Sequence, residues 1–165
     1  FKKVAPFYSM FDVGTYTFER YKVVWPNIAS RLDAAVISEA EGKTILPQHI
    51  VTLVSCRSKN EAHYICAMIN SEIANFCAQV YSMKGGKSFG DPHILQNIRI
   101  HKFDPRNSLH LKLAELSEKA HELAPMGDEI QLKSVQQEID QRAAELWDIT
   151  KMELEEIKRC LVEIG

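Results

Sequence analysis

The chain lacks the features that mark several special classes of protein. Its 165 residues are 45% hydrophobic and 25% charged, an ordinary globular composition. No apolar run approaches the roughly 20 residues needed to span a bilayer, and no signal peptide opens the chain. Four cysteines do not indicate a disulfide framework in a chain of this length. We therefore expect no membrane partner and a reducing, cytoplasmic setting.

Charge is divided unevenly along the chain. Residues 1–106 carry 13 Lys+Arg and 9 Asp+Glu (net +4), whereas residues 107–165 carry 7 and 13 (net -6). The total of -2 excludes a uniformly basic nucleic-acid-binding protein but leaves room for a locally basic face. The patterning also changes at this point, so we predict a mixed domain over 1–106 and a helical support segment over 107–165. Because the chain begins at Phe1, we expect both to belong to a longer polypeptide.

The first part contains short runs of β-branched and aromatic residues, which are typical of strands. Alternation along one of these runs places Tyr21, Val23 and Trp25 on one face of a strand and Lys22 and Val24 on the other. The expected strands cover 8–13, 21–25, 34–38, 50–56 and part of 94–100.

One central helix is expected within this mixed domain. Ser58 and Glu61 form a capping box that specifies its start. Apolar residues then recur at helical spacing as far as Val80 and predict a single buried stripe. A turn is expected before the helix at Glu41-Gly42-Lys43, and a glycine-rich loop after it over 82–92.

The second part shows three helical seams of apolar residues, each preceded by a capping signal or a helix breaker. Short connections between them predict antiparallel neighbours. The seams lie within 109–123, 128–146 and 150–164. The expected fold class is therefore α+β: a small mixed α/β domain with short strands and one central helix, followed by an antiparallel helical segment.

The glycine-rich loop resembles a nucleotide-binding loop only superficially. Gly86-Lys87-Ser88 lacks the required glycine five residues earlier, where Tyr81 stands, and the loop follows a helix rather than a strand. Its glycines can still turn backbone N–H groups toward an anion, with Lys84 and Lys87 adding positive charge. A DNA backbone contact and a plain surface connection remain equally open for this loop.

Signals for catalysis or metal binding are weak. No Gly-x-Ser-x-Gly elbow is present, and no close carboxylate pair stands out, so a free-standing hydrolase is not favoured. His110 and His121 share a helix face without a third partner, which indicates partly exposed or interfacial histidines. One quartet has the right side chains for zinc but not the usual spacing, and its thiols are better explained as buried apolar groups. It comprises Cys56, His63, Cys66 and Cys77.

Aromatic and basic residues gather near the start of the chain. Such a cluster suits base stacking and phosphate contact, although in a small β-rich domain the rings more often belong to the core. The cations remain candidates for DNA contact. The cluster comprises Tyr16, Phe18, Arg20, Tyr21, Lys22 and Trp25.

These motifs, in their order, resemble a known family. Residues 13–18 (VGTYTF) followed by 21–25 (YKVVW) are similar to the opening of the TaqI-like specificity region of adenine-specific DNA methyltransferases. These enzymes belong to type II and type IIG restriction–modification systems of prokaryotes. Further matching segments occupy 67–71, 98–105, 113–121 and 138–150. One departure is His101-Lys102-Phe103, where the family often has proline.

The resemblance implies a DNA-recognition module and no enzymatic activity in this segment. The Asn-Pro-Pro-Tyr motif of methyl transfer is absent. In the family it lies in an upstream N-terminal methyltransferase domain of the same polypeptide, which binds S-adenosylmethionine. We therefore expect no cofactor here, double-stranded DNA as partner, and a parent SAM-dependent adenine-N6 methyltransferase with or without a fused endonuclease.

Charge, loop placement and the resemblance together select the candidate DNA-binding residues. Five cations are expected to hold phosphates, and Ser88 to lie near a base edge. The alternative is a protein–protein docking module with no nucleic-acid role, and self-association through the C-terminal helices is a further expectation. The five cations are Arg20, Lys22, Lys43, Lys84 and Lys87.

Overall fold

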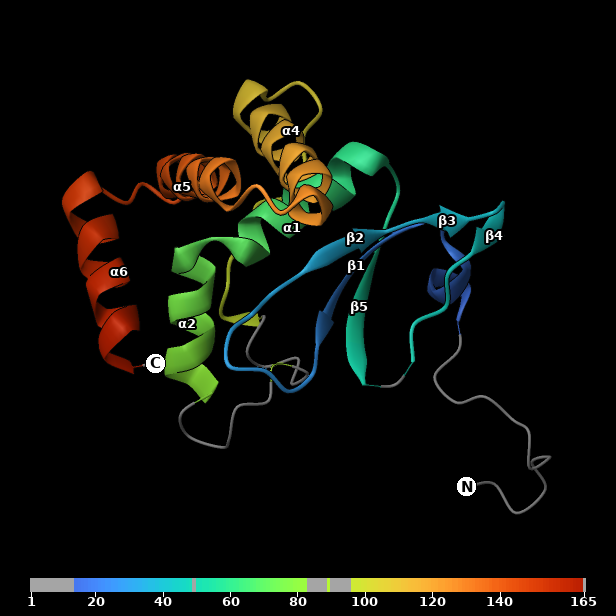
Figure 1. Cartoon of the computed structure of the whole chain (residues 1–165), viewed down its shortest axis with the longest axis horizontal. Coiled ribbons are helices and arrows are strands. Elements are labelled where there is room, and N and C mark those ends of the chain that lie inside the picture. The colour runs from blue at the N-terminus through green and yellow to red at the C-terminus, as the bar shows by residue number, and fades with distance from the viewer. Residues whose placement is uncertain (1–13, 49, 83–88, 90–95, 165) are drawn as a thin grey trace, which may run out of the picture.

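The computed structural model describes residues 14–48, 50–82, 89 and 96–164. These residues form helices and short antiparallel strands, which confirms the predicted α+β class (Figure 1). In chain order the elements are η1 (Thr15–Phe18), β1 (Tyr21–Pro26), β2 (Ala35–Ile37), β3 (Glu39–Ala40), β4 (Lys43–Thr44), β5 (Val51–Cys56), α1 (Lys59–Asn70), α2 (Glu72–Ser82), α4 (Ser108–Leu123), η2 (Ala124–Met126), α5 (Glu129–Leu146) and α6 (Lys151–Ile164).

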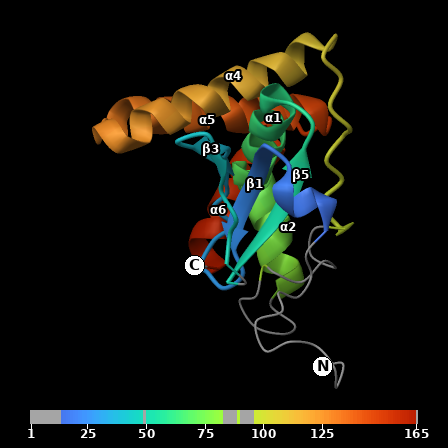
Figure 2. The ribbon, with the colours of Figure 1, turned by 90° about the vertical axis from the view of Figure 1, so that its right-hand side faces the viewer.

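The main sheet has three strands in the order β2-β1-β5, all antiparallel, and β3 and β4 form a separate hairpin. Val23 on β1 lies opposite Val36 and Val54. Val23 and Trp25 are buried and Tyr21 packs beside them, so the predicted alternation is confirmed. Figure 2 shows α1 and α2 behind this face of the sheet. The expected strand over 8–13 lies outside the described residues.

The strand expected within 94–100 does not form over its described residues, 96–100. The Ile100 N–H donates to the Ile98 carbonyl oxygen (2.9 Å) in a tight turn, and the Trp147 indole N–H donates to the Arg99 carbonyl oxygen (2.8 Å). Ile98 and Ile100 instead contribute their side chains to the hydrophobic core. Burial of these β-branched residues therefore does not require strand pairing.

The expected single central helix is broken at Ser71 into α1 and α2. Ser71 has an extended backbone (φ -64°, ψ 149°). Its hydroxyl donates to the Met68 carbonyl oxygen (2.8 Å) and accepts from the Ala74 N–H (3.3 Å), so it ends one helix and begins the next. The apolar stripe changes face at the break, which leaves Val80 42% exposed.

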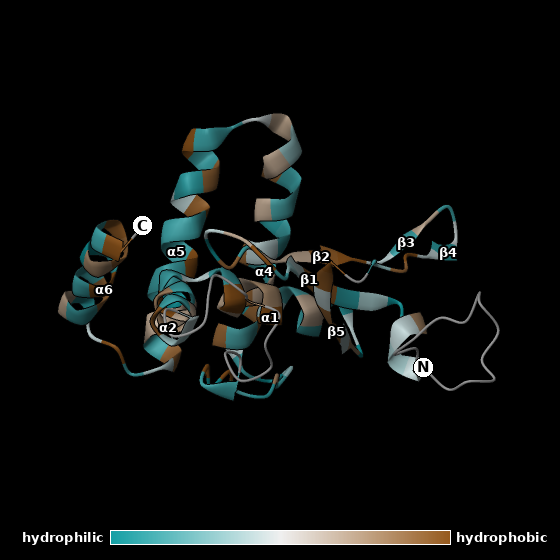
Figure 3. Ribbon diagram, turned by 90° about the horizontal axis from the view of Figure 1, so that it is seen from below, coloured by the Kyte–Doolittle hydropathy of each residue, from teal (hydrophilic) through white to brown (hydrophobic). Residues whose placement is uncertain are grey.

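The three predicted C-terminal helices are present, but only two of them form an antiparallel pair. α4 and α5 lie side by side and join through η2, extending together away from the sheet (Figure 3). The predicted cap at Asp128 is confirmed, because its carboxylate accepts from the Gln131 N–H (3.0 Å). The prediction is wrong for α6, which turns away after Asp148 (φ 54°) and packs beside α2.

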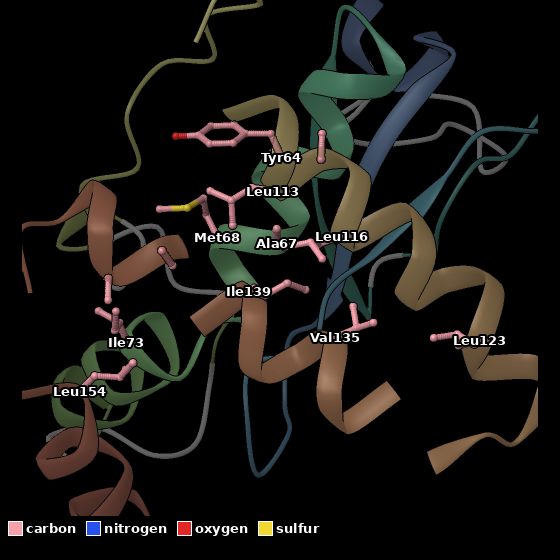
Figure 4. Close-up of a cluster of buried hydrophobic side chains, with 13 residues drawn as sticks. Tyr64, Ala67, Met68, Ile73, Leu113, Leu116, Leu123, Val135, Ile139 and Leu154 are labelled. Carbon is pink, nitrogen blue, oxygen red and sulfur yellow. The ribbon is translucent and has the colours of Figure 1, made fainter. Parts of the chain in front are cut away.

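Two buried clusters share α1, which therefore lies between two layers. The helical cluster combines Tyr64 and Met68 of α1 with Leu113 and other residues of α4, α5 and α6 (Figure 4). The sheet cluster combines Ile69 of α1 with Trp25 and other residues of the sheet and of α2. The helical cluster thus extends across residue 106, where the charge and the type of secondary structure change.

Candidate nucleic-acid interface

The β3–β4 hairpin extends from the body of the protein at the end opposite α6 (Figures 1 and 3). Glu39 pairs with Thr44 and Ala40 with Lys43, which leaves Glu41 and Gly42 as a two-residue turn. This confirms the predicted turn. Side chains of successive strand residues point to opposite faces, so Lys43 lies on the face opposite Glu39.

Arg20 lies at the base of this hairpin. Its guanidinium is 3.4 Å from the Glu39 carboxylate, and its side chain remains 62% exposed. The guanidinium also lies 5.3 Å from the centre of the Tyr21 ring. An exposed ion pair of this kind contributes little to stability, so Arg20 can exchange its carboxylate for a phosphate at small cost. The structure therefore brings Arg20 and Lys43 to the two faces of one hairpin.

Lys22 does not reach this surface. Its side chain is fully buried, opposite Ile37 and Ser55 in the sheet. Its ammonium donates to the main-chain carbonyl oxygen of Glu19, and burial lowers the pKa of the Lys22 amine. This placement contradicts the prediction that Lys22 contacts phosphate. Lys22 lies on the face of β1 opposite Val23, as alternation requires, and its ammonium bonds to the turn that precedes β1.

The glycine-rich loop after α2 carries the remaining candidates, Lys84, Lys87 and Ser88, which lie outside the described residues. Phe89, the next residue, is buried. Its N–H donates to the Asn27 carbonyl oxygen (2.6 Å), and its carbonyl oxygen accepts from the Trp25 indole N–H (3.1 Å). The chain is thus fixed at the end of β1 directly after Ser88.

Arg20 and Phe89 lie at opposite ends of β1. Arg20 immediately precedes β1, whereas Phe89 is bonded to Trp25 and Asn27 at the other end of the strand. Six strand residues span roughly 20 Å at about 3.3 Å per residue. The structure brings Arg20 to Lys43 but does not bring either of them to Phe89.

The aromatic cluster divides between the core and the surface. Trp25 is buried, as the core interpretation predicts. Tyr16 and Phe18 in η1 are 42% and 57% exposed, so these two rings are accessible to a partner. β5 contacts η1, which places the rings at the hairpin end of the sheet.

A groove of about 1100 Å³ lies between the β1–β2 connection, α2 and the C-terminal helices. Its lining combines apolar side chains, such as Ala67, Leu132 and Ile139, with polar and charged side chains of both signs. Asp140 is buried at the groove and lies 3.5 Å from the Lys158 ammonium. Burial raises the pKa of the Asp140 carboxyl, against the opposing effects of the Glu72 N–H and Lys158.

Histidines occupy structural positions where α1 and α4 meet β2. His121 accepts from the Val36 N–H through Nε2 (2.9 Å), and its Nδ1 lies 2.8 Å from the Ser117 carbonyl oxygen. His63 is buried edge-on to His121, with ring centres 5.1 Å apart. Burial and, to a smaller extent, the neighbouring His121 together lower the pKa of His63 to about 4. His110 is also buried and accepts from the Asp104 N–H (3.0 Å). The predicted interfacial role is thus confirmed for His121, whereas His110 belongs to the interior.

The four cysteines are free thiols, and Cys56 and Cys66 are buried. Burial raises the pKa of both thiols to about 12, which makes them poor nucleophiles and poor ligands. Within the described part of the chain, no three His, Cys, Asp or Glu side chains are arranged to hold a metal ion. In the same part of the chain no helix has the length and apolar character needed to cross a membrane.

Comparison with known proteins identifies no relative. The chain matches no family model, no curated protein and no solved structure. The features that bear on function are therefore the hairpin, the groove and the resemblance carried by the sequence motifs. One residue at the hairpin was assigned no role from the sequence: Glu41, whose only signal was its place in a turn between two short strands.

Proposed function

We propose that this chain recognises double-stranded DNA and inserts the β3–β4 hairpin into the major groove. The observation that supports the proposal is the placement of exposed Arg20 and Lys43 on opposite faces of a short, projecting hairpin. The major groove admits a two-stranded β-ribbon, and cations on its two faces can approach the phosphates of both strands. Phosphate contacts of this kind set the register in which base edges are read.

The second end of the sheet extends the proposed contact. About 20 Å separates the two ends of β1, which corresponds to roughly six base pairs at about 3.4 Å per pair. Phe89 lies at that far end, and the candidates Lys84, Lys87 and Ser88 precede it in the sequence. The proposed site is thus about as long as a short restriction–modification target.

The C-terminal helices suit a supporting role in this proposal. Residues 107–165 carry a net charge of -6, which repels phosphate. α5 and α6 lie away from the hairpin (Figure 1), so their charge does not face the proposed DNA surface. With the sequence resemblance, this supports assignment to the target-recognition region of an adenine-N6 methyltransferase. S-adenosylmethionine and the catalytic groups would then belong to a separate domain of the parent polypeptide.

The experiment is fluorescence anisotropy of the chain with mixed-sequence duplexes at several salt concentrations. We expect log Kd to rise with log salt concentration, because phosphate contacts release counterions. Arg20→Ala/Lys43→Ala should reduce the slope by about 2, since each phosphate contact contributes about 0.9. Lys84→Ala/Lys87→Ala should reduce the slope by a similar amount.

The matched control is Lys133→Ala/Lys151→Ala, which removes two exposed cations from α5 and α6. This control should leave the slope unchanged. Absence of binding at low salt would contradict the proposal. An equal loss of slope in the control and in the hairpin variant would show that net charge, rather than the hairpin, governs binding.

Protein docking is the second candidate function, and the groove beside α6 is the observation that favours it. Val162 lines the groove and is 84% exposed, so its apolar side chain is available to a partner. Self-association through this face should appear as a concentration-dependent mass in sedimentation velocity. Val162→Asp should abolish it, whereas a monomer at all concentrations would exclude this form of docking.

A further inference from the structure

The tip of the β3–β4 hairpin has an unusual residue for its conformation. Glu41 has φ 53° and Gly42 has φ 73°, the combination found in a type I′ turn. Asn, Asp and Gly are the residues that normally occupy the first position, because their side chains tolerate the left-handed region. Glu41 places a longer carboxylate at a position where the backbone disfavours it.

The Glu41 carboxylate has no partner within the described part of the chain. In these residues the Glu41 carboxylate makes no hydrogen bond and no ion pair, even with Lys43, which follows the turn directly. The Glu41 side chain is exposed. Glu39, two residues earlier, differs, because its carboxylate pairs with Arg20. The carboxylate oxygens of Glu41, at the tip of the hairpin, are therefore available to accept hydrogen bonds from a partner.

The flanking cations make this carboxylate compatible with DNA. A carboxylate entering a groove is repelled by phosphates on both sides. Lys43 follows Glu41 closely in sequence, and Arg20 lies at the base of the hairpin on its other face. Cations at both faces can neutralise the nearest phosphates, so the carboxylate can approach the base edges between them.

We propose that Glu41 reads a cytosine in the target sequence by accepting a hydrogen bond from its exocyclic N4 amino group. This inference rests on the proposed DNA-recognition function. In the major groove cytosine presents a donor, whereas guanine presents O6 and N7 acceptors and thymine presents the O4 acceptor. Adenine presents a donor beside the N7 acceptor, which repels the second oxygen of a carboxylate. Of the four bases, cytosine is thus the best partner for Glu41.

The experiment selects duplexes from a random library with the wild-type chain and with Glu41→Gln, then sequences the bound fraction. The wild type should select one position as cytosine. Glu41→Gln should lower that preference about tenfold and shift it toward adenine, because a glutamine amide pairs with adenine N6 and N7. Glu41→Asp keeps the carboxylate and should retain the preference for cytosine.

The matched control is Glu163→Gln, which makes the same change of charge at an exposed position of α6. It should select the same sequence as the wild type. An unchanged preference in Glu41→Gln, with salt-dependent binding intact, would overturn the role of Glu41 and leave the DNA-recognition function standing. Absence of salt-dependent binding by the wild type would overturn the function and the role together.

Discussion

The two buried clusters of this protein are stabilised in different ways. The helical cluster is formed by apolar side chains at helical spacing, such as Leu113, Leu116 and Ile139. Its helices begin at caps made by residues close in sequence, including Asp128 with Gln131 and Thr150 with Glu153. Local signals therefore specify the helices of this cluster, and burial of their seams fixes how they pack.

The sheet cluster depends more on polar contacts between distant residues. The Asn75 side-chain amide accepts from the Leu32 N–H (2.7 Å) and donates to the Leu32 carbonyl oxygen (3.2 Å). Asn70 makes the equivalent pair with Ala34, at 2.7 and 2.8 Å. These two side chains hydrogen-bond to backbone N–H and carbonyl groups of the β1–β2 connection, as a neighbouring strand would. The Trp25 indole fixes Phe89 in a similar way.

The difference between the clusters shows how a small sheet satisfies its buried backbone hydrogen-bonding groups. Within the described residues the main sheet has three strands, and β2 is three residues long. Few ladder hydrogen bonds are available, so amides from α1 and α2 supply further partners for buried backbone groups. The proposed DNA-binding hairpin directly follows β2, and its position therefore depends on these helix-to-strand contacts.

Leu113→Ala should have the largest effect and tests whether the two clusters unfold together. Leu113 is fully buried in the helical cluster, so the substitution should lower the free energy of unfolding by about 3 kcal/mol. Urea unfolding in a Trp147→Phe background, followed by circular dichroism and by fluorescence, checks this, since Trp25 is then the one tryptophan of the chain and lies in the sheet cluster. Leu111→Ala, at a 37% exposed position of the same helix, is the control and should cost much less. Separate transitions for the two probes would show that the clusters are independent.

Asn75→Ala should have the next largest effect and tests the polar support of the sheet. The change leaves the buried N–H and carbonyl of Leu32 without their partner, which should cost about 2 kcal/mol. Denaturant unfolding measures the loss. Asn60→Ala, an exposed asparagine on α1, is the matched control. A cost no greater than that of the control would mean that the amide contacts contribute nothing to stability.

His63 should make the stability of the junction between the clusters dependent on pH. Its folded-state pKa of about 4 lies below the ordinary 6.5, because of burial and of His121, with Glu118 acting in the opposite direction. The unfolded chain therefore binds the proton first, and stability should fall as pH drops from about 6.5 to about 4, by about 1–2 kcal/mol.

His63→Gln should remove this part of the pH dependence, which urea unfolding at pH 7 and pH 4.5 can measure. His101→Gln changes an exposed histidine and serves as the control. If wild type and His63→Gln lost the same stability between the two pH values, protonation of His63 would not be the cause.

Much of the fold could be predicted from residues close together in sequence. The strand alternation at Val23 and Trp25, the cap at Ser58 and the turn at Glu41-Gly42 are all present. The break at Ser71 was missed because apolar residues continue at helical spacing on both sides of it. A serine that ends one helix and begins the next does not alter that spacing in the sequence. The burial of Lys22 was missed because its partner is a backbone carbonyl, which no side-chain pattern indicates.

The candidate site divides in the same way. The sequence alone identified the cations near the start of the chain and the turn that joins β3 to β4. Only the tertiary structure shows that Lys22 is buried, that Arg20 pairs with Glu39, and that Glu41 lies at the tip of the hairpin.

The sequence by itself determined where helices begin, where the chain turns and which faces are apolar, because those signals come from contacts within a few residues. Only the tertiary structure decided the connections made by His121 to Val36 and by Asn75 to Leu32, whose partners are 85 and 43 residues apart. Such contacts form when packing brings distant backbone groups to a side chain and excludes water from both. No local pattern encodes that meeting, and the position of the hairpin relative to the helices depends on it.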